Sequence, residues 1–453
     1  MTLQKNMRLE LVVEDFGAQG EGICRHEGMA VFVPRALPGE RILAQIVKVE
    51  KRHAFARVIE VLSPSSARVE PPCPYYVQCG GCVCQHMDYP SQLRFKQKQV
   101  EGVMRHIAGL DIEVRPTLGM DDPWHYRNKT ALPVAGSAEQ PLIGYYAQRS
   151  HRVVEIEACR IASAQSDAVH AVVRQWMCEC RIAPYCEETH KGLVRHVMTR
   201  VSRKGESMVV LVINGDKLPK WEMLLEKLQK AVPGLISLCV SVNKARGNVI
   251  LGRSYDVLWG AERLPDTLCG HEFQLSPLSF FQVNPVQTEK LYGTALDFAA
   301  LTGNELVADV YCGAGTISLM LARHAKHVVG IEIVPQAIAD AKENARRNGV
   351  ENAEFRVGAA EDVLPELVEN GLRPDVIVID PPRKGCEESV LTAIAKAKPR
   401  RVVYVSCNPA TQARDAKILC ANGYHAAACQ PVDMFCQTAG VENVMLFILN
   451  EGE

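Results

Sequence analysis

Asp309-Val310-Tyr311-Cys312-Gly313-Ala314-Gly315-Thr316 is the stretch that decides the fold. It joins an apolar run typical of a buried strand (ELVADVY, 305–311) to one typical of a helix (ISLMLARHA, 317–325). Glycines at a strand-to-helix turn let the backbone bend tightly beside a ligand. The segment therefore predicts a binding site for a nucleotide-like cofactor, although a purely structural turn has the same sequence pattern.

Strands and helices alternate on both sides of this turn. A helix is expected around residues 288–301, and the turn is followed by a strand (HVVGIEI, 327–333), a helix (QAIADAKENARRN, 336–348) and two further strands (VIVID, 376–380; RVVYVS, 401–406). Such alternation is typical of a doubly wound, largely parallel sheet. We therefore expect a Rossmann-like domain over residues 271–453.

Two residues narrow the kind of cofactor. A dinucleotide-binding turn has a third glycine where this chain has Ser318, which disfavours a pyrophosphate ligand. Glu332 ends the next strand, where a carboxylate can accept hydrogen bonds from both hydroxyls of a ribose. This combination resembles the S-adenosylmethionine-binding pattern of class I methyltransferases. Asp380, ahead of Pro381 and Pro382, ends a later strand at the sheet edge that holds ligands, with helix capping as its alternative role.

A cysteine follows the strand at 401–406, in Ser406-Cys407-Asn408-Pro409, at the same sheet edge. Most cysteines are small buried hydrophobic residues, and this chain has 17 of them. The polar neighbours and the proline-containing turn instead favour a loop that faces a ligand. Cys407 is therefore the candidate for a reactive thiol.

A denser group of cysteines lies in CPYYVQCGGCVCQH, residues 73–86. Thiols this close in sequence predict ligation of zinc or of an iron–sulfur cluster, with loose reduced cysteines in a turn as the alternative. The spacing differs from that of zinc ribbons and from that of radical S-adenosylmethionine enzymes. The loop can supply three ligands and the central region a fourth, Cys159, which leaves Cys84 as an extra thiol.

The N-terminal region, residues 1–62, contains short strand-like runs separated by turn residues such as Gly17, Gly20 and Gly22. Closely spaced strands of this kind predict a small OB-like β-barrel, a fold that often binds nucleic acid. Residues 63–270 mix helix and strand patterns and are expected to form an α+β central domain that includes the cysteine-rich loop. The whole chain is thus an α/β multidomain protein.

Composition sets the remaining limits. The 453 residues carry a formal net charge of −1, which excludes a globally basic nucleic-acid binder but allows local patches. One such patch is indicated in residues 191–204, which contain five cations and no acid. A solvated strand face is the alternative interpretation of this segment. No signal-peptide pattern or membrane-length apolar run is found, so we expect a cytoplasmic protein with no membrane partner.

Several motifs together resemble the bacterial RNA uracil-5-methyltransferases, the group that modifies large-subunit ribosomal RNA and the T loop of transfer RNA. The motifs are CPYYVQCGGC (73–82) with QH after it, FFQVNP (280–285), DVYCGAGT (309–316), DPPRKG (380–385), SCNP (406–409) and VENV (441–444). The resemblance covers nearly the whole chain. It departs from the family at Cys84, an additional thiol, and at Thr316, where some members have asparagine.

The resemblance implies an N-terminal TRAM domain, a [4Fe-4S] cluster and a role for each matching residue. S-adenosylmethionine would contact Gln282, Tyr311, Glu332 and Asp380, and the cluster ligands would be Cys73, Cys79, Cys82 and Cys159. Cys407 matches the nucleophile and Glu442 the base that removes a proton. Phe280 matches an aromatic residue that stacks on the target base.

The chemistry explains why such a site needs a thiol and a base. Carbon 5 of uracil is too weak a nucleophile to take a methyl group directly from a sulfonium, and a thiolate added at carbon 6 activates it. A base then removes the proton from carbon 5, and a buried carboxylate suits this step because burial raises its pKa. The target base must also leave the RNA stack before a thiolate reaches it.

The expected substrate is 23S ribosomal RNA rather than transfer RNA, because the transfer-RNA enzymes look like relatives without the TRAM domain and the cluster. DNA is not expected as a partner. The protein is expected to act as a monomer. Three alternatives stay open: a transfer-RNA uracil-5-methyltransferase, a non-catalytic RNA-binding protein with a redox-sensing iron–sulfur cluster, and a methyltransferase for an exocyclic amine. The last would not need Cys407.

Overall fold

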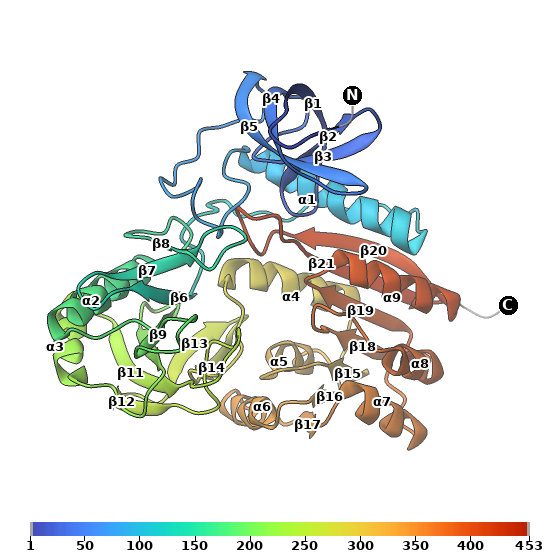
Figure 1. The fold of residues 1–453 in the computed structure, drawn as a ribbon. Helices are drawn as coiled ribbons and strands as arrows, with labels where there is room; N and C mark the ends of the chain where they lie inside the picture. Colours follow the sequence, from blue (N-terminus) through green and yellow to red (C-terminus); the bar gives the residue numbers. More distant parts are fainter. Residues whose placement is uncertain (1–2, 451–453) are drawn as a thin grey trace.

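The computed structural model describes residues 3–450. Three β-structures follow one another along the chain: a closed barrel, a mixed seven-stranded sheet and a second seven-stranded sheet. Figure 1 shows the barrel above the two sheets, with helices on both faces of the C-terminal one. Within this part of the chain, no helix combines the length and the apolar character needed to cross a bilayer.

The barrel has five strands in the order β1-β2-β3-β5-β4. Its alternate side chains, such as Ile42, Ala44 and Ile46 of β4, face inward and are fully buried. Gly22 was expected in a turn but pairs with Val33 within β2. Glycine suits this position because a Cβ there would stand 2.8 Å from the carbonyl oxygen of Ala36. The strands are β1 Arg8–Phe16, β2 Glu21–His26, β3 Met29–Pro34, β4 Arg41–Val49 and β5 His53–Ser63.

An ion pair with one buried partner joins the barrel to the segment that follows it. The Glu40 carboxylate is fully buried and accepts hydrogen bonds from Arg68 Nη2 at 2.7 Å and from the Leu37 amide at 2.8 Å. Helix α1 (Tyr89–Val103) comes next, capped by Asp88, and continues as one π-helical turn, η1 (Met104–Ala108). Both lie against the C-terminal sheet and its helix α9 rather than against the central sheet.

The central sheet has the order β12-β11-β10-β9-β6-β7-β8, and its strands are antiparallel except for the pair β10 and β11. Two helices, α2 (Ala164–Cys180) and α3 (Trp221–Ala231), cover one face around the buried Trp176. The strands are β6 Lys129–Gly136, β7 Pro141–Tyr146, β8 Val153–Glu155, β9 Val194–Val201, β10 Ser207–Ile213, β11 Leu235–Val242 and β12 Asp256–Gly260.

The basic segment at 191–204 is not one exposed patch, because two of its arginines point into the protein. Arg195 is 4% exposed, stacks over Tyr185 and donates to two backbone carbonyls of the 243–245 turn. Arg200 is 3% exposed and donates to the carbonyl of Ser279. Strand β9 is buried along its whole length, so charge pattern alone gave the wrong environment for these two side chains.

The C-terminal sheet has the order β17-β16-β15-β18-β19-β21-β20. Its first five strands are parallel, while β21 and β20 run antiparallel to their neighbours. Apolar residues on both faces of these strands pack against helices, as a doubly wound sheet requires. The strands are β15 Leu306–Val310, β16 His327–Glu332, β17 Ala353–Val357, β18 Val376–Ile379, β19 Arg401–Ser406, β20 Tyr424–Val432 and β21 Glu442–Leu449.

Helices α4, α5 and α6 contribute to the core on one face, and α7, α8 and α9 contribute to the core on the other. A hairpin of β13 (Leu264–Leu268) and β14 (His271–Leu275) links this domain to the central sheet. The expected fold class, with its OB-like barrel, α+β middle and Rossmann-like C-terminal part, is confirmed. The helices are α4 Pro285–Ala299, α5 Thr316–Ala322, α6 Pro335–Arg347, α7 Ala360–Glu369, α8 Glu388–Ala397 and α9 Pro409–Ala421.

Candidate active site

The sheet order places five of the predicted site residues along one edge. The parallel strands all end at this edge, and the antiparallel β21 begins there. Along the sheet order β16-β15-β18-β19-β21, the residues at the edge are Glu332, Tyr311, Asp380, Cys407 and Glu442. Open α/β sheets bind ligands at this end of their strands.

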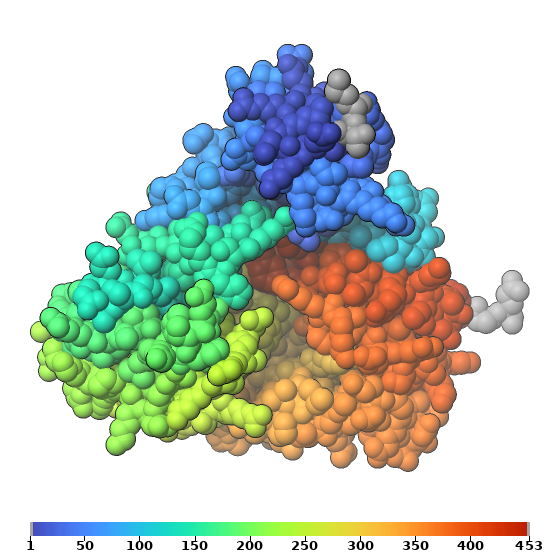
Figure 2. All heavy atoms as spheres, in the orientation of Figure 1, coloured from blue at the N-terminus to red at the C-terminus, as the bar shows by residue number. Residues whose placement is uncertain are grey.

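These residues line one cavity of about 880 Å³, together with Phe280 and Gln282. A cavity of this size is large enough for a drug-sized ligand. Arg253 and the 278–280 segment form part of the wall, so the cavity lies between the central and C-terminal regions. Figure 2 shows the surface hollowed between these regions, coloured green to yellow and orange to red.

The glycine turn forms one end of the cavity. Tyr311 has a φ of 69°, a strained left-handed conformation for a residue with a side chain. The Glu332 carboxylate accepts hydrogen bonds from the Gly313 amide at 3.2 Å and the Val334 amide at 2.9 Å, which ties the ends of two strands together. Gly315 also has a left-handed backbone, and a Cβ there would press on Ala341 and Phe355.

The opposite end of the cavity brings together a thiol and a carboxylate. Ser406 of β19 pairs with Asn443 of β21, so the next residue outward on each strand, Cys407 and Glu442, lie opposite one another. Glu442 is 4% exposed, whereas Cys407 is only partly buried. The two side chains are contributed by strands adjacent in the sheet but distant in sequence.

Burial is the main cause of the raised pKa values at this end of the cavity. It raises the pKa of the Glu442 carboxyl to about 8, with a further contribution from the charge of Asp380. Burial also raises the pKa of Asp380 to about 7. The pKa of the Cys407 thiol is raised by burial and by both carboxylates, and the Arg383 guanidinium opposes this shift through its charge and a hydrogen bond. Arg383 is thus the cation at this end of the cavity that favours the thiolate.

Phe280 lies at the rim with 73% of its surface exposed, which is unusual for a phenylalanine. The neighbouring backbone is fixed: the Ser279 hydroxyl donates to Asp340 at 3.1 Å, and Asn128 Nδ2 donates to the carbonyl of Gln282 at 3.0 Å. An apolar ring on a fixed backbone, open to solvent at the mouth of a cavity, is well placed to stack on a flat ligand.

Sequence reasoning missed several residues of the cavity, among them Arg383 and Phe435. Arg383 is in the quoted DPPRKG motif, but its role depends on the approach of three acidic or thiol groups that only the fold brings together. Phe435 lines the cavity from the loop between β20 and β21. The sequence could have indicated Phe435, because an aromatic residue close before the predicted base Glu442 is a candidate for the same pocket.

The cysteine-rich loop forms a separate site. Cys73, Cys79, Cys82 and Cys159 line one cavity with Tyr75, Tyr76 and Tyr145, while Cys84 is buried elsewhere, in an apolar cluster with Phe16 and Phe95. The amide of Gly81 donates to Cys79 Sγ at 3.3 Å. Among residues 3–450, no three His, Cys, Asp or Glu side chains come close enough together to bind a single metal ion.

Comparisons with known proteins agree with this architecture. The sequence profile of a family described as tRNA (Uracil-5-)-methyltransferase matches residues 88–449, and that of the TRAM domain matches residues 4–59. An RNA methyltransferase of Halalkalibacterium halodurans, described as uncharacterized, is 50% identical over 99% of this chain and 98% of its own. A similarly described RNA methyltransferase of Clostridium tetani is 44% identical over 98% of this chain and 97% of its own.

A solved structure gives the same result. The tRNA (uracil-54, C5)-methyltransferase of Pyrococcus abyssi, in complex with S-adenosyl-L-homocysteine, has a TM-score of 0.79 and 27% identity, over 97% of this chain and 99% of its own. These matches extend over the barrel, the central sheet and the C-terminal sheet alike. The chain therefore belongs to the tRNA (uracil-5-)-methyltransferase family, and it is an S-adenosylmethionine-dependent RNA methyltransferase that carries a TRAM domain.

Proposed function

We propose that this protein methylates carbon 5 of a uridine in 23S ribosomal RNA through a covalent bond between Cys407 and carbon 6 of the base. The observation that carries the proposal is the pairing of β19 with β21, which puts a thiol and a buried carboxylate opposite one another in the cavity that also contains the glycine turn. A methyltransferase for an exocyclic amine would need no thiol at this position.

The residues divide the reaction into two steps. S-adenosylmethionine supplies the methyl group from its sulfonium. The Cys407 thiolate adds to carbon 6, and the electron pair that this addition places on carbon 5 forms the bond to the methyl group. Glu442 then takes the proton from carbon 5, the carbon 5–carbon 6 double bond forms again, and Cys407 leaves as a thiolate.

The methylation rate is expected to rise with pH from about 7 to 9, because both reacting groups act in their deprotonated forms. Burial raises the pKa of Glu442 to about 8 and raises that of Cys407 above its usual value, so both are largely protonated at neutral pH. Single-turnover rates across this range are the measurement. A rate that falls over the same interval would contradict these assignments.

Glu332→Gln is expected to weaken the binding of S-adenosylhomocysteine by roughly 10- to 100-fold, because a neutral acceptor makes weaker hydrogen bonds to ribose hydroxyls than a carboxylate does. Isothermal titration calorimetry is the measurement. Glu343→Gln is the control, since that carboxylate pairs with Arg346 and Arg347 on α6 and does not line the cavity. Equal affinities in both variants would remove Glu332 from the cofactor site.

The cysteine cavity fits a [4Fe-4S] cluster by its donor set. Four thiols from two segments surround one space, and four thiolates are the ligand set that a [4Fe-4S] cluster takes. Cys73, Cys79, Cys82 and Cys159 would hold the cluster. Methyl transfer from a sulfonium requires no electron, so its role would be structural rather than that of a redox sensor.

Anaerobically purified protein is expected to contain about four iron atoms per chain, as a single cubane cluster requires. Cys82→Ser is expected to lose most of this iron, whereas the control Cys84→Ala keeps it, because Cys84 does not line the cavity. Iron analysis and visible absorption are the measurements. Full iron content in Cys82→Ser, or its loss in Cys84→Ala, would show that the ligand assignment is wrong.

Transfer RNA is the second candidate substrate. The Pyrococcus abyssi enzyme, which acts on uracil 54 of transfer RNA, matches this chain over nearly the full length of both proteins. An architecture of this extent is therefore compatible with either RNA. Assays of 23S ribosomal RNA and of transfer RNA with labelled S-adenosylmethionine separate the two: label in 5-methyluridine of transfer RNA alone would replace the ribosomal assignment, and label in neither RNA would favour a non-catalytic protein.

A further inference from the structure

We propose that helix α1 and the cysteine loop (residues 73–86) position the β20–β21 loop (residues 433–441), and through it Phe435 and Glu442 at the reactive end of the cavity. Lys96 and Asp433 form the central contact of this arrangement, and both are positioning residues rather than catalytic ones. The inference rests on the proposed function, in which Glu442 removes the proton from carbon 5.

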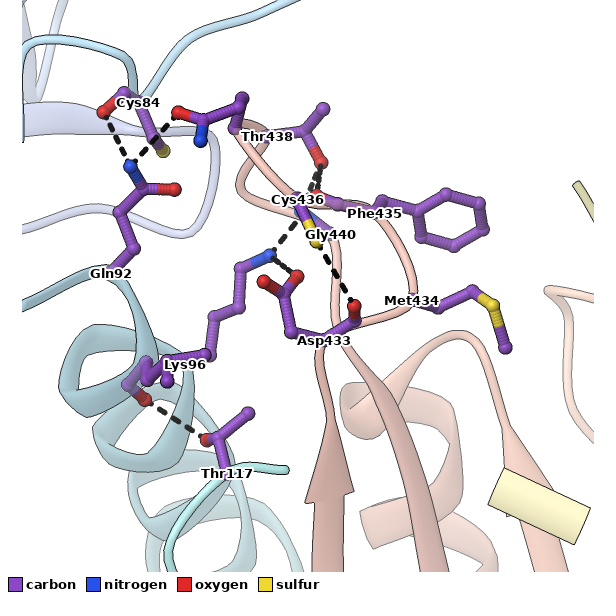
Figure 3. A network of polar contacts seen from close by, with 12 residues as sticks. Cys84, Gln92, Lys96, Thr117, Asp433, Met434, Phe435, Cys436, Thr438 and Gly440 are labelled. Atoms are coloured by element: carbon purple, nitrogen blue, oxygen red, sulfur yellow. Dashed lines mark hydrogen bonds and ion pairs between the residues drawn. The ribbon is translucent and has the colours of Figure 1, made fainter. Parts of the chain in front are cut away.

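The first contact is a buried ion pair between α1 and the β20–β21 loop. The side chains of Lys96 and Asp433 are both 0% exposed and are bonded to each other. Lys96 Nζ also donates to the carbonyl of Phe435 at 3.1 Å, and the Tyr89 hydroxyl donates to the second carboxylate oxygen of Asp433 at 2.8 Å. Figure 3 shows the lysine reaching from the helix to two points of the loop.

The second contact joins the same loop to the cysteine loop. The amides of Val83 and Cys84 both donate to the carbonyl of Gln437 at 3.0 Å. Gln92 Nε2 donates to the carbonyl of Cys84 at 3.1 Å and to Gln437 Oε1 at 3.0 Å. Next to these bonds, the buried Cys436 packs in a cluster that includes Cys82 and Cys159. The segment with the candidate cluster ligands therefore touches the loop directly.

The β20–β21 loop connects these contacts to the cavity. Phe435 lines the cavity, and Glu442 is the first residue of β21, directly after the loop. From the opposite side, Asn284 Nδ2 donates to the carbonyl of Met434 at 3.1 Å, and Gln287 Nε2 donates to that of Asp433 at 3.0 Å. A shift of the loop would therefore move an aromatic wall of the cavity and the residue that begins the next strand.

A fully buried ion pair adds little net stability, because the loss of hydration of two charges offsets their attraction. We infer that the pair instead holds two segments in place, because the Lys96 ammonium on α1 contacts both the Asp433 carboxylate and the Phe435 carbonyl of the loop. Misplacing a reacting group by about 1 Å can slow a reaction by roughly 10²-fold. The expected defect after removal of the pair is therefore slow proton abstraction at carbon 5.

The test uses the full-length protein and three variants. Lys96→Met/Asp433→Leu removes both charges and leaves no unpaired charge in the interior. Tyr89→Phe keeps the ring and removes the hydroxyl, which donates to Asp433 and accepts from the Met120 amide. Glu40→Gln/Arg68→Met is the matched control, because it removes another pair with a fully buried carboxylate, between the barrel and the segment after it. Neither control residue lines the cavity.

In the Lys96→Met/Asp433→Leu variant, amide hydrogen exchange of residues 434–440 is expected to become faster, with unchanged affinity for S-adenosylhomocysteine. Breakdown of the covalent protein–RNA adduct should slow by roughly 10- to 100-fold, so that the adduct accumulates. Tyr89→Phe should change both readouts in the same direction by a smaller factor. The control variant should change neither.

Wild-type exchange in residues 434–440 in both the double variant and Tyr89→Phe would overturn the proposal. Equal changes in the control variant would also overturn it, because they would show a general loss of stability rather than positioning. Hydrogen exchange does not depend on the chemistry of methyl transfer. Absence of an adduct in Glu442→Gln would contradict the proposed function. The exchange result tests the positioning role independently of that outcome.

Discussion

Glu442→Gln is expected to trap the protein on its RNA. In this variant Cys407 can still add to carbon 6 and carbon 5 can still take the methyl group, but the carboxylate assigned to remove the carbon-5 proton is missing, and the thiol cannot be eliminated until that proton is lost. Removal of a general base lowers turnover by roughly 10²- to 10⁴-fold, so the methylated adduct should accumulate. A denaturing gel with labelled RNA detects it as a shifted band.

The Glu442→Gln experiment has a matched control in Glu343→Gln, which changes a carboxylate on α6 outside the cavity. The control should show wild-type turnover and no persistent band. If Glu442→Gln released methylated RNA as fast as the control, another group would have to be the base. Asp380 would be the first to examine, because it lies in the same cavity and burial raises its pKa to about 7.

Cys407→Ala is expected to lose methylation activity by at least about 10⁴-fold, since without the thiolate carbon 5 is not nucleophilic enough to take a methyl group. It should bind S-adenosylhomocysteine normally, because Glu332 and the glycine turn lie at the other end of the cavity. Formation of 5-methyluridine and calorimetric affinity are the measurements.

Cys420→Ala is the control for this substitution, because that cysteine lies in helix α9 outside the cavity, where alanine suits a helix. It should keep full activity. The double variant Cys407→Ala/Glu442→Gln should form no adduct, because the sulfur that bonds to the base is missing. An adduct in the double variant would mean that a different nucleophile attacks the RNA.

The sequence was sufficient for the C-terminal sheet and for most of its site edge. A parallel strand buried on both faces reads as a continuous apolar run, and the polar residue that ends it marks the ligand-binding edge. Glu332, Asp380 and Cys407 were found in this way. Local patterns report such positions well because each is fixed by its own strand.

Residues that depend on long-range packing could not be found from local patterns. Arg195 and Arg200 look like surface cations, but their buried environment is made by backbone carbonyls far away in the sequence. Lys96 is a similar case, because its partner Asp433 lies 337 residues further along the chain. Without the fold, nothing indicates that α1 packs against the C-terminal sheet rather than the central one.

The covalent bond itself can be tested with an RNA substrate that contains 5-fluorouridine at the target position. Fluorine cannot leave carbon 5 as a proton does, so the adduct persists after methyl transfer in the wild-type protein. Digestion and mass spectrometry should then find the methylated nucleotide attached to the peptide that contains Cys407. Attachment to another cysteine, or complete absence of attachment in a protein that methylates the unmodified RNA normally, would contradict the mechanism.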